Sequence, residues 1–261
     1  PDGNAAEIPS NGFLAGFEPK SKVALQDDWS LAWEAGDAVA IYNGETFSSY
    51  QAQESGATTT LLGEDVENVA HCAFYPYSDE LEFEGTSVTA VIPGKQTPKI
   101  GNFPYNPSVA YVAAGNKSLA FYNICGLVGF EITEEETGVS NVVIFGNNNE
   151  ILTGGIKVDC NSTTPKASVV EGRGVQSVTL QADGVFEPGV YYVAVLPQKF
   201  EQGITITMNA PDGKQYKKTS APFTLNRSHR INASNINDGA FGAENIISNA
   251  AELQAFFNVV N

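Results

Sequence analysis

Apolar and polar residues alternate along much of this chain with a period of two, which is typical of β-strands with one buried face. The clearest case is the segment 204–209, where Ile204, Ile206 and Met208 alternate with threonine and asparagine. Asp212-Gly213 follows this segment and predicts a turn that pairs it with residues 215–219. A helix would need a repeat of 3.6 residues, so the pattern favours strands.

Turn-forming residues separate many such short segments. Asn43-Gly44 follows Val39 and Ile41, which alternate with alanines, and predicts a hairpin with residues 47–51. A second hairpin is expected around Asn147, between residues 141–145 and 151–158. Further strands are expected at 58–62, 71–75, 88–92, 178–180, 189–196 and 223–225. Many short strands separated by turns predict an all-β sandwich architecture.

The stretch Leu119–Ile132 is the longest run that is almost uncharged. Gly126 and Gly129 interrupt it, and each would cost about 1 kcal/mol in a helix interior. We therefore expect one or two short strands, buried on both faces, near the middle of the chain. Together with the loop 93–107, which holds four prolines, this predicts two tandem β-sandwich domains.

The domain boundaries follow from these features. Near the end, Asn249 and Glu252 resemble a capping box, and Leu253, Phe256 and Val260 recur at helical spacing. This predicts a short C-terminal helix with an apolar face that must pack against another part of the protein. We therefore expect a further domain to follow it. The expected parts are a flexible leader at 1–12, an N-terminal sandwich at 13–106, a C-terminal sandwich at 107–236, and a linker and helix at 237–261.

The charge balance excludes several partners. The net charge is −16, with three arginines in 261 residues. A nucleic-acid-binding protein needs a basic surface to displace counterions, so nucleic acid is excluded, as is an anionic membrane surface. No apolar run reaches the length of a membrane-spanning segment.

Three cysteines leave one that cannot pair within the chain. Cys72 and Cys125 lie in apolar strand-like runs and are expected to be buried free thiols, although a Cys125–Cys160 bridge remains an alternative. No pair of cysteines has metal-ligand spacing, and we expect neither a metal nor a cofactor.

No catalytic pattern stands out. His71 and His229 are the two histidines, and neither lies in the motif of a known nucleophile class. Carboxylates are plentiful, as in Glu134-Glu135-Glu136, but a solvated acidic turn is their default interpretation. We expect no enzyme activity; a hydrolase built from scattered carboxylates is the remotest alternative. A possible sugar-binding platform consists of Tyr75, Tyr77, Phe103 and Tyr105, which could equally cap a sheet edge.

An ordered set of motifs resembles the fimbrillin family of surface proteins. It begins with Phe13, Phe17 and Trp33-x-x-Gly36-Asp37. The later matches, in the family's order, are Ala73-Phe74-Tyr75-Pro76, Ile92-Pro93 with Gln96, the stretch 119–132, Gly189–Pro197, and Phe200 with Gly203. The resemblance spans about residues 13–232.

The resemblance implies two transthyretin-like β-sandwich domains in an exported lipoprotein, anchored by lipid on its precursor, at the outer membrane and cell surface. Such subunits form pili, anchors or tips, and a neighbour's strand replaces an N-terminal strand removed after a basic residue. Here that strand would be Gly12, Phe13, Leu14 and onward to Phe17. The family's usual arginine is absent, because no arginine precedes Arg173, so the processing sites would be Lys20 and Lys22.

The expected function is therefore that of a fimbrillin-like structural or adhesive protein: a pilus subunit, a tip or a stand-alone adhesin. Its partners would be other pilus subunits or a receptor on a host or bacterial surface, with a glycan as a further possibility. The alternative is a carbohydrate-binding module of a larger surface protein.

Overall fold

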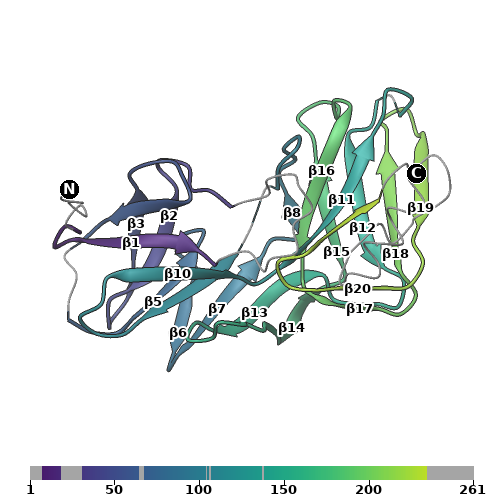
Figure 1. The fold of residues 1–261 in the computed structure, drawn as a ribbon. Coiled ribbons are helices and arrows are strands. Elements are labelled where there is room, and N and C mark those ends of the chain that lie inside the picture. The colour runs from purple at the N-terminus through teal and green to yellow at the C-terminus, as the bar shows by residue number, and fades with distance from the viewer. Residues whose placement is uncertain are drawn as a thin grey trace, which may run out of the picture. The chain divides into compact units, whose positions relative to one another are not determined.

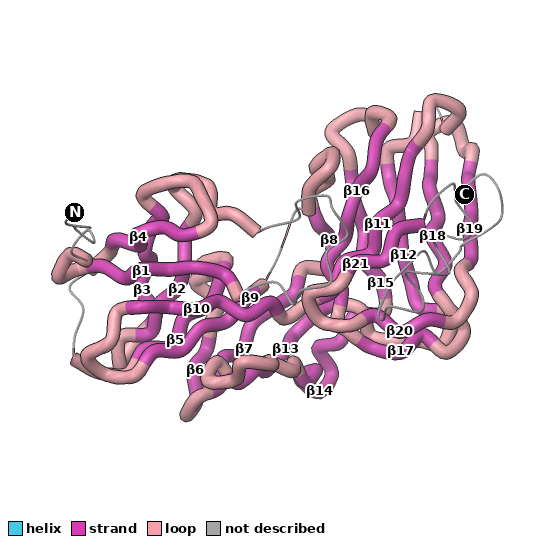
Figure 2. Tube along the Cα trace, viewed as in Figure 1, coloured by secondary structure: helices cyan, strands magenta, loops and turns pink. Residues whose placement is uncertain are grey.

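The computed structural model describes residues 8–18, 31–64, 68–103, 105, 107–136 and 138–233. In this part of the chain all regular structure is β-strand, as Figure 2 shows by its magenta segments and lack of cyan. The all-β class is thereby confirmed. The predicted C-terminal helix lies outside the described residues. Within the described residues no helix could cross a membrane.

The chain divides into two compact units that do not follow one cut in the sequence. The first unit consists of residues 1–90, 107–124 and 157–168, and the second of residues 91–106, 125–156 and 169–261. The sequence predicted a single boundary at 106. The segment 107–124 instead belongs with the first unit, because both of its strands pair there.

Seven strands of the first unit form a closed hydrogen-bonded ring, in the order β1-β10-β9-β5-β2-β3-β4. Their bounds are β1 Gly12–Phe17, β2 Ala38–Tyr42, β3 Phe47–Ala52, β4 Thr58–Leu62, β5 His71–Tyr75, β9 Ser108–Val112 and β10 Ser118–Asn123. Each of these strands contributes buried residues to one hydrophobic core, which also includes Trp33. Closure of the ring removes the free sheet edges that an open sheet would expose.

Two sheets build the core of the second unit. One has the order β16-β11-β21 and the other β19-β18-β12-β15-β8. The bounds are β8 Lys95–Gln96, β11 Gly126–Ile132, β12 Asn141–Gly146, β15 Ser177–Gln181, β16 Gly189–Val195, β18 Ile204–Asn209, β19 Gln215–Thr219 and β21 Arg230–Ala233. A single cluster of buried side chains draws on strands of both sheets, which is how a β-sandwich is packed.

The remaining strands complete the fold. A four-stranded sheet has the order β14-β13-β7-β6, and a two-stranded one pairs β17 with β20. Their bounds are β6 Glu82–Glu84, β7 Ser87–Ile92, β13 Thr153–Asp159, β14 Ser168–Val175, β17 Gln198–Phe200 and β20 Phe223–Leu225. The predicted hairpin around Asn147 is wrong, because β12 pairs with β15 and β18 while β13 belongs to a different sheet.

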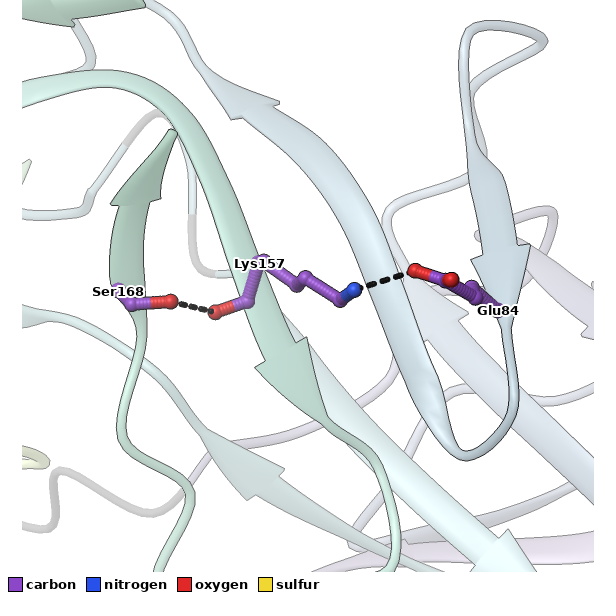
Figure 3. A network of polar contacts seen from close by, with 3 residues as sticks. All are labelled: Glu84, Lys157 and Ser168. Carbon is purple, nitrogen blue, oxygen red and sulfur yellow. Dashed lines mark hydrogen bonds and ion pairs between the residues drawn. The ribbon is translucent and has the colours of Figure 1, made fainter. Parts of the chain in front are cut away.

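One ion pair links β6 to the end of β13 within the first unit (Figure 3). The Lys157 ammonium donates to the Glu84 carboxylate, and the Ser168 hydroxyl donates to the Lys157 backbone carbonyl at 3.2 Å. The hydrogen bond from Lys157, and then its charge, lower the pKa of Glu84. Because the Glu84 side chain is 83% exposed, this pair adds little to stability.

The cysteine pairing differs from the expectation. Cys72 and Cys160 form a disulfide, with their Cα atoms 6.0 Å apart, so the prediction of a free Cys72 thiol is wrong, as is the alternative Cys125–Cys160 bridge. The Cys160 amide donates to the Thr86 carbonyl at 3.0 Å, which holds the half-cystine against the start of β7. Cys125 is a buried free thiol, as predicted, and burial raises its pKa, so it stays protonated.

Gln96, one of the residues in the resembled motifs, hydrogen-bonds to the backbone of β16, an edge strand of its sheet. Its side-chain amide donates to the Ala194 carbonyl and its side-chain oxygen accepts from the Ala194 amide, both at 2.9 Å. Gln96 is 3% exposed, so replacing it would leave both backbone groups of Ala194 buried without these partners.

We therefore expect Gln96→Leu to lower the free energy of unfolding by about 2 kcal/mol, because each unsatisfied buried polar group costs about 1–3 kcal/mol. Urea denaturation would measure the loss. The exposed Gln181→Leu is the control, since its side chain serves only surface contacts. Equal stability of Gln96→Leu and the unsubstituted protein would contradict this role.

Candidate functional site

The strand β1 closes the ring of the first unit. It pairs in parallel with β10, where Leu14 opposes Ser118, and antiparallel with β4, where Phe13 opposes Leu61. In Figure 1 it is the purple strand alongside β10. Both edges of β1 are thus hydrogen-bonded. Its loss would leave two unpaired strand edges in the ring.

The inward side chains of β1 fill the core of the ring. Phe13 and Ala15 are fully buried. The Phe13 ring meets the rings of Tyr50 and His71 edge to face, with centroids 5.7 and 5.0 Å away. Since alternate residues of a strand point to the same side, Phe13 and Ala15 both face the core.

Phe17 ends the strand in a cluster of aromatic rings. It stacks on Trp33 with centroids 4.5 Å apart and lies 6.2 Å from both Tyr75 and Phe121. Trp33 is held by reciprocal backbone hydrogen bonds with Gly56, at 2.8 and 3.0 Å. The Trp33 indole is 1% exposed and belongs to the core of the ring.

The turn after Trp33 explains the Gly36-Asp37 part of the motif. Gly36 has a φ of 94°, a conformation that residues with a Cβ rarely adopt. The Asp37 carboxylate accepts from the Glu34 amide at 2.9 Å. The chain therefore reverses its direction here and enters β2.

The outward face of β1 carries mostly small residues. Leu14 is 39% exposed, and a Cβ built on Gly12 would lie 2.8 Å from a methyl carbon of Leu62. The Lys117 ammonium donates to the carbonyls of Pro9 and Ser10, each at 2.7 Å, and fixes the segment that leads into the strand. The predicted processing residues, Lys20 and Lys22, lie outside the described part of the chain.

The four aromatic residues expected as a ligand platform occur in two different units. Tyr75 and Tyr77 belong to the first unit and Phe103 and Tyr105 to the second. Tyr75 packs on Trp33 with centroids 5.3 Å apart, and burial, followed by the Asp37 carboxylate, raises its pKa. The Tyr105 hydroxyl donates to the Val91 carbonyl at 3.2 Å. Tyr77 is 38% exposed and borders a surface pocket.

Both histidines lie close to backbone carbonyl groups, and one of them also packs in the core. His71 is 2% exposed, with Nδ1 at 3.1 Å from the Tyr42 carbonyl and its ring against Phe13. His229 is exposed, and its Nδ1 lies 2.8 Å from the Arg227 carbonyl. Among the described residues, no group of three or more histidine, cysteine or acidic side chains could hold a metal ion.

Comparison with known proteins finds similarity to solved structures. No family model matches the chain, and no curated protein matches it. A putative cell adhesion protein from Bacteroides uniformis is 17% identical with a TM-score of 0.50, covering 77% of this chain and 87% of that protein. One from Bacteroides ovatus is 13% identical with a TM-score of 0.48, covering 77% and 82%.

The tip fimbrial protein Mfa3 from Porphyromonas gingivalis, with a C-terminal truncation, also aligns. It is 8% identical with a TM-score of 0.30, covering 85% of this chain and 94% of that protein. Of these three, only the Bacteroides uniformis protein reaches a TM-score that carries weight for the fold. The chain shares the fold of that putative cell adhesion protein.

Proposed function

We propose that this protein is a fimbrillin-like structural or adhesive protein of the cell surface, which acts by binding other proteins and not by catalysis. The observation that carries the proposal is the position of β1, the first strand of the described residues, which is hydrogen-bonded on both sides and closes the ring. The shared fold with a putative cell adhesion protein supports it.

Removal of β1 would open a groove with defined chemistry. Its walls would be the freed backbone edges of β4 and β10, and its floor the sites vacated by Phe13, Ala15 and Phe17. A strand from another subunit could restore the backbone hydrogen bonds and fill these sites with alternate side chains. This is how a strand exchange would link subunits without any catalytic group.

The surroundings of β1 suit a removable strand. The two lysines that follow it, Lys20 and Lys22, are the only lysines or arginines among the first ninety residues of the sequence. A cut there would leave β1 held by noncovalent contacts alone. We further propose export to the outer membrane, with a lipid anchor on the precursor, because the resembled family has both.

Limited trypsin digestion tests this proposal. We expect early cleavage after Lys20 or Lys22, followed by concentration-dependent oligomers on native gels and by size-exclusion chromatography. The double variant Lys20→Gln/Lys22→Gln should remain uncut at this position and monomeric. Lys166→Gln is the control, because Lys166 is an exposed lysine elsewhere in the first unit.

Mass spectrometry of the oligomer distinguishes the outcomes. Loss of residues 1–20 or 1–22 from the oligomer would support strand exchange. A cleaved protein that releases this segment and yet stays monomeric at every concentration would contradict it.

A further inference from the structure

Two edge strands of the structure carry opposite charges. The strand β6 ends the sheet β14-β13-β7-β6, and β19 ends the sheet β19-β18-β12-β15-β8. Within the described residues, Glu82–Glu84 of β6 pair with β7 alone, and Gln215–Thr219 of β19 pair with β18 alone. Each strand therefore keeps one edge of unpaired backbone N–H and C=O groups, onto which a further strand can add.

The edge formed by β6 is acidic. Four of the six residues 79–84 are aspartate or glutamate, and Glu82 and Glu84 are both exposed on one face of the strand. Glu84 is paired with Lys157, whereas Glu82 forms no ion pair within the described residues. Phe83 lies on the opposite face and is half-buried. Glu82 thus offers a carboxylate beside the unpaired backbone edge.

The edge formed by β19 is basic. Residues 214–218 hold three lysines, Lys214, Lys217 and Lys218, more than any other five consecutive residues of the sequence. Lys217 is exposed, and in the part of the chain that the structure describes it forms no ion pair. Tyr216 is half-buried against the core of the second unit. Both edges thus alternate an exposed charged residue with a half-buried aromatic one.

The charges favour pairing between the two edges and oppose pairing of either edge with itself. Charged residues on a sheet edge keep like edges apart, because like charges directly opposite each other destabilise a strand pair. An antiparallel pairing of β6 with β19 can instead place Phe83 opposite Tyr216. The same register places Glu82 opposite Lys217. Aromatic pairs and pairs of opposite charge both stabilise neighbouring strands.

We propose that β6 of one copy of this chain pairs with β19 of a second copy. Because the two surfaces differ, each copy in such a pair keeps one free edge and can bind a further copy. The inference goes beyond the proposed strand exchange, since it needs neither cleavage nor release of β1. The contact is small and the net charge of −16 makes copies repel, so the association is weak. We expect it in concentrated protein and not in the dilute samples of native gels and chromatography.

The test is sedimentation equilibrium of the full, uncleaved chain at high protein concentration, where we expect the average mass to rise with concentration. Glu82→Lys and Lys217→Glu should each weaken the association about fivefold or more, because each places like charges opposite each other. Overall charge alone would move these two variants in opposite directions. An equimolar mixture of the two should associate like the unsubstituted protein, because every contact between unlike variants pairs opposite charges again.

Two control variants make the same changes of net charge at exposed residues of neither edge, Glu131→Lys on β11 and Lys199→Glu on β17. Each should change the association less than the matching edge variant, and equal losses would overturn the proposal. A protein that stays monomeric at every concentration would overturn it too, as would a mixture that associates no better than either edge variant alone. Lys20→Gln/Lys22→Gln should associate like the unsubstituted protein, so this proposal and strand exchange can fail separately.

Discussion

Replacing Phe13 by alanine should lower the free energy of unfolding by about 3–5 kcal/mol, the usual cost of removing a buried phenylalanine ring. Phe13 is fully buried and touches the rings of Tyr50 and His71, so its loss leaves a cavity at the centre of the ring-shaped sheet. The measurement is urea denaturation followed by tryptophan fluorescence, to which the buried Trp33 contributes.

The neighbouring residue supplies a control on the same strand. Leu14 points outward and is 39% exposed, so Leu14→Ala should cost well below the Phe13 variant, about 1 kcal/mol or less. If the two variants were equally stable, Phe13 would not anchor β1. A large loss in Phe13→Ala alone would show that the inward face of β1 holds the strand in place.

Removing the disulfide by Cys72→Ala/Cys160→Ala should lower the free energy of unfolding by about 4 kcal/mol. The bond joins residues 88 positions apart, and cross-linking so long a loop restricts the unfolded chain strongly. Thermal unfolding followed by circular dichroism, with and without a reducing agent, measures the effect.

The reductant serves as an internal control. It should lower the Tm of the unsubstituted protein and leave that of Cys72→Ala/Cys160→Ala unchanged. Cys125→Ala should still respond to reductant, because Cys125 is a free thiol. A double variant with the Tm of the unsubstituted protein would contradict a stabilising role of the bond.

Local patterns in the sequence predicted much of the fold. Alternation predicted β18, and the Asp212-Gly213 turn correctly predicted its pairing with β19. Asn43-Gly44 likewise predicted the hairpin of β2 and β3. The stretch 119–132 lies in two strands, β10 and β11, in agreement with the expected one or two. The expected burial on both faces is wrong for β10, in which exposed and buried residues alternate. These features depend on neighbours in the chain, which a sequence pattern records.

Pairings between distant segments could not be predicted in this way. β1 lies beside β10, about a hundred residues later, and no turn residue encodes that parallel contact. The Cys72–Cys160 bond depends equally on long-range placement, because β5 and the end of β13 meet only in the folded chain. The wrong hairpin at Asn147 arose from adjacency, since the chain leaves β12 for another sheet.

The candidate site likewise has features that local sequence patterns predicted and features that depend on distant segments. The apolar residues Phe13 and Phe17 identified the strand, because they repeat on one face and match a resembled motif. The contact of Tyr42 and Phe47 with Phe83 was missed. Tyr42 and Phe47 flank a turn that was predicted, but Phe83 joins them only through the tertiary contact of β6.

The most direct test of the account is whether a free β1 strand can replace the native one. Protein cleaved after Lys22 would be incubated with an isotope-labelled peptide of residues 8–18, and native mass spectrometry would count the peptides bound. The account predicts one labelled peptide per chain, suppression of oligomers, and no uptake of the same peptide with Phe13→Asp. Equal uptake of both peptides, or of neither, would contradict a ring closed by an exchangeable strand.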